Sequence, residues 1–299
     1  MSFSFEAKNE LCRLPVQKLC CARAEAYGIL LYCNTFSAGE VRIITGNPAL
    51  AGRLPKLFQR AFSIRFDRMP EAGETGKLVF QITDEAKIRR IVDLLGFSPE
   101  QNLALHINFG LLEEDCCRAS FLRGVFFAGG SVTDPAKRYH LELATSHLQV
   151  SRELEVLLRE CGYPPKGLSR NGSFITYFKQ SDQIEDFLTL IGAPVAAMHL
   201  MSAKLEKDLR NSVNRRLNCD SANLDKAVEA AQEQLEAIRR LRSADLLDKL
   251  PDKLKKTAAL RLEYPELSLS ELAAAFDPPV TKSCLNHRLR KIQELAKTL

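Results

Sequence analysis

Apolar residues recur every three or four positions in several stretches of the chain, and each stretch predicts a helix with one buried face. Such helices are expected near residues 6–32 and over 48–61, 84–95, 116–128, 149–160 and 181–191. Alternating apolar and polar positions predict half-buried strands at 41–45, 63–66, 77–82 and 139–145, and a hairpin from 167–170 and 173–179. The glycine pair at 129–130 is expected to end its helix in the left-handed conformation.

Two of these helices carry small residues along one face, which favours close approach of another backbone. An offset of 96 residues maps Cys20-Cys21 onto Cys116-Cys117, and it also maps Ile88 onto Ile184 and Gly96 onto Gly192. A shared offset at both ends of a segment indicates internal duplication, although coincidence among common residues remains an alternative. We therefore expect two αββαββα copies that meet through the small residues Ala24, Gly28, Ser120, Gly124 and Ala128.

The pattern divides the chain into four parts. Residues 1–96 and 97–192 are the two copies, 193–222 is a linker, and 223–299 is an all-helical domain. The linker is predicted to be helical over 195–209. Residues 210–220 have no sustained period, and Arg210, Arg215 and Arg216 in this stretch could lie on phosphates or belong to a plain hinge.

The last part has the pattern of a helix-turn-helix. One apolar stripe contains Leu224, Val228, Ala231, Leu235 and Ile238, and a second contains Leu254, Ala258 and Leu262. Ser268 and Glu271 have the spacing of a capping box, which predicts the start of a short helix. The prolines of 277–280 force a turn, and Thr281 can cap a final helix with the apolar face Leu285, Leu289, Ile292 and Ala296.

The final helix places polar and basic side chains opposite its apolar face. Asn can read adenine and Arg can read guanine, and we expect base contacts from Ser283, Asn286, His287 and Arg290. Lys282, Arg288 and Lys291 flank them and are better placed for phosphates. The alternative is that these side chains form an ordinary solvated face.

Charge and composition narrow the function further. The net charge is +5, and the residues from 193 onward hold 19 Lys+Arg against 15 Asp+Glu, so most of the excess lies there and favours a polyanion partner. No apolar run is long enough to cross a membrane, and the N-terminus has no secretory pattern, so we expect a cytoplasmic protein. The nine cysteines form no Cys-x-x-Cys pair and lack histidines at metal spacing, and we expect no metal and no cofactor.

The motifs carry a family resemblance that covers nearly the whole chain. Residues 122–130, Leu-Arg-Gly-Val-Phe-Phe-Ala-Gly-Gly, resemble a degenerate LAGLIDADG helix of homing endonucleases. Together with the stretches at 139–142, 210–215, 218–223, 277–280 and 286–291, the chain resembles the WhiA family of bacterial transcription regulators. The resemblance implies a pseudo-twofold pair of helices, a DNA saddle and a helix-turn-helix similar to the promoter-reading domain of sigma factors. It also implies a role in sporulation, or in cell division and chromosome segregation, with RNA polymerase and a sigma factor as a partner.

The predicted saddle carries candidate DNA contacts. Its residues are Arg42, Arg65, Arg68, Arg170, Asn171, Tyr177 and Lys179. A β-ribbon with such side chains fits the major groove, although each of them alone is more typical of an ordinary exposed strand residue.

Catalysis is predicted to be lost. LAGLIDADG endonucleases hold a divalent metal with one acid near the end of each paired helix, and here those positions are Gly129 and, by the 96-residue offset, Cys33. Neither residue supplies a hard oxygen ligand. We therefore expect no enzyme activity.

The expected function is that of a nucleoid-associated protein that binds promoter double-stranded DNA in a sequence-specific way. A metal-dependent DNA endonuclease and an RNA-binding maturase-like module are the alternatives. Tyr32 is bulky where the repeat predicts a small residue, which puts close packing at that end in doubt.

Overall fold

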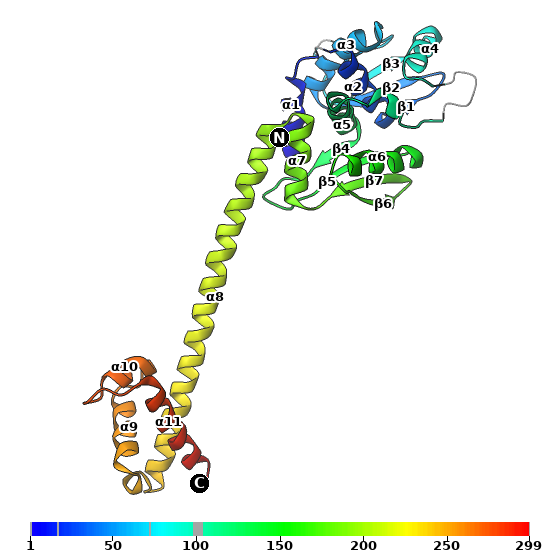
Figure 1. Cartoon of the computed structure of the whole chain (residues 1–299). Coiled ribbons are helices and arrows are strands. Elements are labelled where there is room, and N and C mark those ends of the chain that lie inside the picture. The colour runs from blue at the N-terminus through cyan, green and yellow to red at the C-terminus, as the bar shows by residue number, and fades with distance from the viewer. Residues whose placement is uncertain (1, 17, 72, 98–103, 299) are drawn as a thin grey trace. The chain divides into compact units, whose positions relative to one another are not determined.

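The computed structural model describes residues 2–16, 18–71, 73–97 and 104–298. It divides into two compact units, Met1–Lys207 and Asp208–Leu299. The first unit contains both copies of the repeat as a mixed helix and strand fold, and the second is helical (Figure 1). The predicted fold class, two αββαββα copies followed by a helix-turn-helix domain, is confirmed, with the corrections given below.

The elements of the first unit follow the repeat. After α1 (Phe3–Cys12), the first copy contains α2 (Leu19–Tyr32), β1 (Thr35–Phe36), β2 (Val41–Thr45), α3 (Pro48–Phe62), β3 (Leu78–Ile82) and α4 (Glu85–Leu94). A short 3-10 turn, η1 (Phe109–Leu111), precedes the second copy. That copy contains α5 (Asp115–Gly129), β4 (Gly130–Val132), β5 (Leu141–Thr145), α6 (Leu148–Glu160), β6 (Lys166–Arg170), β7 (Ser173–Phe178) and α7 (Ser181–Ile191).

Each copy forms its own antiparallel sheet. The strand orders are β1-β2-β3 and β4-β5-β7-β6. Val41 and Leu141, which begin β2 and β5, are 100 positions apart, whereas α2 and α5 begin 96 positions apart. The second copy is therefore four residues longer between its first helix and its second strand, and the offset returns to 96 at α4 and α7.

The first copy lacks the strand predicted at 63–66. Ser63 is the left-handed cap of α3, with φ 58°. Ile64 and Phe66 are buried, but pairing with β3 is limited to an isolated bridge between Arg68 and Gln81. Two residues later Pro70 has no N–H to donate to a ladder, so the pairing cannot extend in that direction.

Three further predictions are corrected. The helix expected near 6–32 is two helices, because Pro15 cannot continue a helix and disfavours helical backbone at Leu14. Gly129 and Gly130 have no positive φ, and Gly130 is extended at φ −89°. Residues 210–220, for which no period was found, lie inside the continuous helix α8 (Pro194–Ser243), which excludes a hinge with non-helical backbone there.

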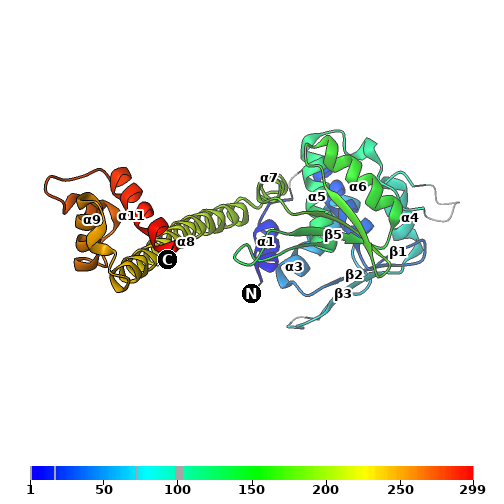
Figure 2. The same ribbon diagram turned by 90° about the horizontal axis from the view of Figure 1, so that it is seen from below.

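The two repeats meet where α2 and α5 lie side by side at the centre of the first unit (Figure 2). A Cβ atom on Gly28 would lie 2.2 Å from the carbonyl oxygen of Phe121, and one on Gly124 would lie 2.1 Å from that of Glu25. Ala24 and Ser120 are buried beside them, and Ala128 is partly buried against the core. The stripe of small residues is therefore the seam where the two backbones touch.

A buried charge network closes this seam. The Glu25 carboxylate accepts hydrogen bonds from Arg53 of α3, at 2.6 and 2.9 Å, and from Arg123 of α5, at 3.0 Å. Arg123 also donates to the carbonyl oxygen of Ile191, the last residue of α7, at 2.7 Å. One carboxylate thus ties helices of both copies together.

The second unit packs α9 (Asp252–Glu263), α10 (Leu269–Ala274) and α11 (Lys282–Lys297) against the end of α8, with the 3-10 turn η2 (Leu247–Lys249) between α8 and α9. Its core contains Ile238, Leu241, Ala258, Leu272 and Leu289. Leu224 and Val228 belong to the predicted apolar stripe, but they are 65% and 48% exposed, since none of the described helices covers that part of α8. Among the described residues, no helix is both long and apolar enough to cross a membrane.

Candidate nucleic-acid interface

The short helix α10 begins at a capping box. Ser268 Oγ accepts a hydrogen bond from the Glu271 amide at 3.3 Å, and the Glu271 carboxylate accepts one from the Ser268 amide at 2.9 Å. Hydrogen bonds that the Ser268 side chain and amide donate to the Glu271 carboxylate lower the pKa of that carboxyl. The amide of Val280 donates to the Ala273 carbonyl at 3.1 Å, which fixes the turn relative to α10.

The second helix of the pair is anchored along one face. Thr281 Oγ1 accepts a hydrogen bond from the Cys284 amide at 3.2 Å and so caps α11 as predicted. Leu285, Leu289, Ile292 and Ala296 are all buried in the core of the second unit. The rotation of α11 about its own axis is therefore determined, and its opposite face is presented to solvent.

That exposed face carries all of the α11 residues predicted to contact DNA except Arg288. The exposed side chains are Lys282, Ser283, Asn286, His287, Arg290 and Lys291. Arg288 differs from them, because it is half-buried and its guanidinium carbon lies 5.7 Å from the centre of the Phe276 ring. Arg288 therefore supports the turn as well as contributing charge. Arg210, Arg215 and Arg216 are exposed on α8.

The predicted saddle residues are not equivalent in the structure. Arg65, Arg68, Arg170, Asn171 and Lys179 are exposed, whereas Arg42 and Tyr177 are half-buried. The Nε atom of Arg42 is buried and has no hydrogen-bond partner among the described residues. The outward-facing positions of the second sheet hold acidic, aromatic and apolar residues. Glu142 pairs with Tyr177, and Ala144 pairs with Ile175. This sheet face is therefore less basic than the sequence prediction implied.

A basic cluster lies instead in the first unit beside β5 and β7. A shallow concavity of about 600 Å³ is lined by Lys137, Arg138, Tyr139, His140, Lys179 and Lys207. The Lys207 ammonium lies 4.7 Å from the centre of the Tyr139 ring and donates to the Pro135 carbonyl at 2.7 Å. Lys179 lies 5.2 Å from the centre of the Tyr177 ring. Cations interleaved with aromatic rings suit a phosphate backbone with unstacked or flanking bases.

Of the residues that line this concavity, the sequence pattern had predicted only Lys179 as a DNA contact. The signal for the rest was the Lys137-Arg138 pair directly before Tyr139. Lys207 could not be placed from the pattern, because it reaches the cluster from α8.

Cys33 and Gly129, the two positions predicted to correspond to the metal-holding acids, lie at the C-terminal ends of α2 and α5. Cys33 Sγ lies 3.2 Å from the carbonyl oxygen of Leu30 and 3.1 Å from that of Thr35, so its single S–H proton can be donated to either of them. Burial raises the pKa of the Cys33 thiol to about 12, so it is protonated at neutral pH. A Cβ on Gly129 would lie 2.4 Å from Tyr32 Cδ1 and 2.5 Å from the Ala144 carbonyl oxygen. Tyr32 therefore fills the space that a side chain at residue 129 would need.

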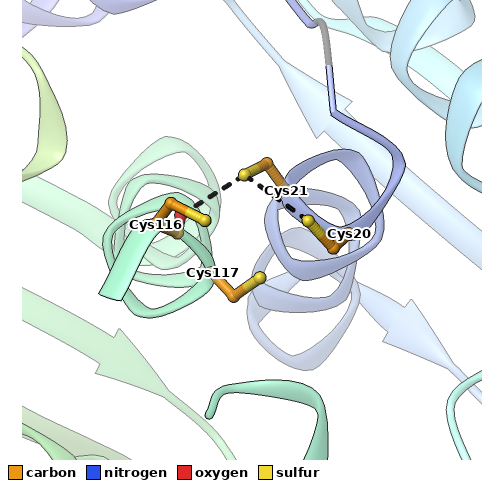
Figure 3. A group of neighbouring side chains, drawn as sticks. All are labelled: Cys20, Cys21, Cys116 and Cys117. Carbon is orange, nitrogen blue, oxygen red and sulfur yellow. Dashed lines mark hydrogen bonds between the residues drawn. The ribbon is translucent and has the colours of Figure 1, made fainter. Parts of the chain in front are cut away.

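At the opposite ends of the same two helices, four cysteines lie together. Cys20 and Cys21 come from the first turn of α2, and Cys116 and Cys117 come from the first turn of α5 (Figure 3). Their sulfur atoms all lie within 4.8 Å of one another. Burial raises the pKa of the Cys117 thiol. The expectation of no metal rested on spacing along the chain, which misses this arrangement, although the 96-residue offset had already paired these residues.

Comparison with family models extends over both units. The model described as the WhiA LAGLIDADG-like domain matches residues 118–210, and that described as the WhiA C-terminal HTH domain matches residues 213–296. A Ruminiclostridium cellulolyticum protein named "Probable cell division protein WhiA" is 36% identical over 307 residues, which cover 100% of this chain and 98% of that protein. A Clostridium novyi protein of the same name is 36% identical over 312 residues, with the same coverage of both chains.

Solved structures show the same architecture. The crystal structure of full-length DUF199/WhiA from Thermatoga maritima matches with a TM-score of 0.60 and 22% identity, covering 100% of this chain and 99% of that one. That of the N-terminal LAGLIDADG domain of DUF199/WhiA matches with a TM-score of 0.50 and 21% identity, covering 64% of this chain and 92% of that one. At these identities the match shows the fold alone. Because curated relatives above 30% identity align with the whole chain, the chain belongs to the WhiA family.

Proposed function

We propose that the protein is a sequence-specific DNA-binding transcription regulator. The observation that carries this proposal is the exposed face of α11, where Asn286 and Arg290 stand opposite a fully buried apolar face. A helix held in this way can enter the major groove with its polar face toward the bases. Lys282 and Lys291 flank that face and would contact phosphates.

The curated relatives are named as cell division proteins, which supports control of division or chromosome segregation genes, or of sporulation genes, as the role. We assign the basic cluster around Lys137, Arg138, Lys179 and Lys207 to further phosphate contacts. Because this cluster is more basic than the outer sheet face, it is the stronger candidate for DNA contact in the first unit. A regulator of this kind would be cytoplasmic and associated with the nucleoid.

We infer that the protein does not cut DNA. Metal-assisted hydrolysis of a phosphodiester needs hard oxygen ligands beside the reacting phosphate. Cys33 is a protonated thiol that faces two backbone carbonyl oxygens, and Gly129 has no room for a carboxylate. Incubation of supercoiled plasmid with the protein and magnesium or manganese should leave the plasmid intact, and metal-dependent nicking would restore the endonuclease alternative.

A contact with RNA polymerase or a sigma factor is the proposed partner interaction. The second unit carries a groove of about 740 Å³ between α8 and the segment that leads into α10. Its walls include the exposed apolar side chains Leu224 and Val228 as well as Leu269. An apolar groove beside a helix-turn-helix would let a promoter-bound protein contact the transcription machinery. Loss of co-purification with the polymerase in a Leu224→Asp variant, with DNA binding retained, is the expected result.

The DNA-binding test begins by selecting preferred sites from genomic fragments and measuring affinity over a series of salt concentrations. Asn286→Ala and Arg290→Ala should weaken binding to the preferred site by about 1–3 kcal/mol each while leaving nonspecific binding unchanged. Lys291→Ala should weaken binding to all duplexes alike and reduce the slope of log K against log salt by about 0.9. Lys256→Ala, an exposed lysine of α9, is the charge-matched control.

Two results would contradict these roles. Equal losses for Asn286→Ala and Lys291→Ala on preferred and random duplexes would remove the distinction between base and phosphate contacts. Tighter binding to a folded RNA than to any duplex, in direct competition, would favour the maturase-like alternative.

A further inference from the structure

We propose that Cys20, Cys21, Cys116 and Cys117 bind one zinc ion as a tetrathiolate site that joins the two repeats at the first turns of α2 and α5. Figure 3 shows the four side chains converging from the two adjacent helices. The proposal concerns the first unit and is independent of what α11 recognises.

The geometry suits a single tetrahedral ion. A zinc–sulfur bond of about 2.3 Å in a tetrahedron places the sulfur atoms about 3.8 Å apart. The four sulfur atoms lie within 4.8 Å of one another, and those of Cys20 and Cys21 are 4.0 Å apart. Each sulfur atom would therefore move inward by less than about 1 Å, which a side-chain rotation supplies. An iron–sulfur cluster places several iron and sulfide atoms between its thiolates and would need wider spacing.

The donor set selects for a soft metal. Four thiolates favour zinc over magnesium or calcium, which prefer oxygen ligands. This separates the site from the divalent-metal chemistry of nucleases. Cys21 and Cys33 are twelve residues apart on α2, which corresponds to roughly 18 Å of helix. The proposed zinc ion is therefore structural and lies far from the former catalytic positions.

The position of the two cysteine pairs at helix starts suits anionic ligands, and an ion can enter from solvent. Each pair occupies the second and third positions of its helix, near the positive end of the helix dipole. Cys20 is exposed and Cys117 is buried, so an ion could reach the cluster from solvent.

A zinc ion at this site would link the two repeats. Its ligands come from two segments 96 residues apart that are related by the repeat, so one ion would bridge equivalent turns across the seam between α2 and α5. Because an ion that binds only the folded arrangement stabilises it, metal binding would hold the two helix starts together.

The test uses the full-length chain, expressed with zinc and purified under reducing, anaerobic conditions. Mass spectrometry of metal content should find one zinc ion per chain. Metal-free protein titrated with cobalt should show the intense visible bands of a tetrahedral tetrathiolate site and saturate at one equivalent. Cys21→Ser and Cys116→Ser should each lose the bound zinc, whereas Cys219→Ser and Cys284→Ser, which change exposed cysteines of the second unit, should keep it.

Several outcomes would overturn the proposal. These are wild-type protein without bound zinc and without the cobalt spectrum, the absorption of an iron–sulfur cluster, and disulfides among the four cysteines that persist under reducing conditions. Equal zinc loss in the control variants would also overturn it. The cobalt titration of the wild-type chain decides the question even where a ligand variant fails to fold.

Discussion

Replacing Gly124 with alanine tests whether the contact between α2 and α5 limits the stability of the first unit. The added Cβ would lie 2.1 Å from the carbonyl oxygen of Glu25 and 3.0 Å from the amide nitrogen of Ile29. Both atoms belong to the backbone of α2, so no side chain can rotate away. The two helices must therefore separate by more than about 1 Å to restore an ordinary contact of about 3.5 Å.

The cost of this separation follows from the packing around the seam. Tyr27, Phe121 and Val125 are fully buried next to it. A gap of 0.5–1 Å removes about a quarter to a half of the dispersion energy of each atom pair across it. Insertion of a methyl group into a close-packed core usually costs about 1–3 kcal/mol. Because only backbone atoms face the methyl group of Gly124→Ala, we expect the free energy of unfolding to fall by at least about 3 kcal/mol. This is a large part of the usual stability of about 5–15 kcal/mol.

Gly52→Ala is the matched control. Gly52 also lies inside a helix, α3, but a Cβ there meets no atom within 4 Å. The same substitution should therefore stabilise the protein by up to about 1 kcal/mol through helix propensity. Denaturant unfolding followed by near-ultraviolet circular dichroism suits the comparison, because five of the six tyrosines lie in the first unit. If Gly124→Ala unfolds at the same denaturant concentration as wild type, the seam is not closely packed.

Three further perturbations test the buried and capping interactions. Glu25→Gln should destabilise the first unit by about 3–5 kcal/mol, since it leaves Arg53 and Arg123 buried without their counter-charge, and denaturant unfolding measures the loss. Partial burial raises the pKa of Asp67, but hydrogen bonds from a lysine and two backbone amides outweigh this and lower it to about 2. The stability from Asp67, about 1 kcal/mol, is therefore present above pH 4 and lost as the pH falls toward 2, and Asp67→Asn should flatten that part of the stability profile. Ser268→Ala should cost about 1 kcal/mol and accelerate amide hydrogen exchange at the start of α10.

The sequence was most informative for helices that bury one face, because their apolar residues recur at a regular spacing. The helices α3, α4, α6 and α7 each bury one face, so their periods and boundaries were predicted within a few residues. The polar stretch 210–220 of α8 is exposed on all sides. No apolar period marks this helix in the sequence, because it has no buried face over these residues.

Contacts between distant segments were harder to predict. The small-residue stripe indicated a close approach at Gly28 and Gly124, because glycine inside a helix is costly unless space demands it. To predict that Cys20 and Cys116 lie together, one must know the register between α2 and α5. The spacing of residues within either helix does not determine that register. Lys207 joined the basic cluster for a similar reason, since its distance from β5 is set by the packing of α8 against the first unit.

The two ends of the α2–α5 pair differ in how well they keep the symmetry of the repeat. At the starts of the helices the repeat symmetry is kept, with a cysteine pair on each side. At their ends the symmetry is broken, because Tyr32 of one copy fills the space beside Gly129 of the other. A carboxylate at residue 129 would collide with Tyr32 and with the carbonyl oxygen of Ala144, so a metal site there would require repacking as well as new ligands. The packing around Gly129 thus supports the proposal that the protein does not cut DNA.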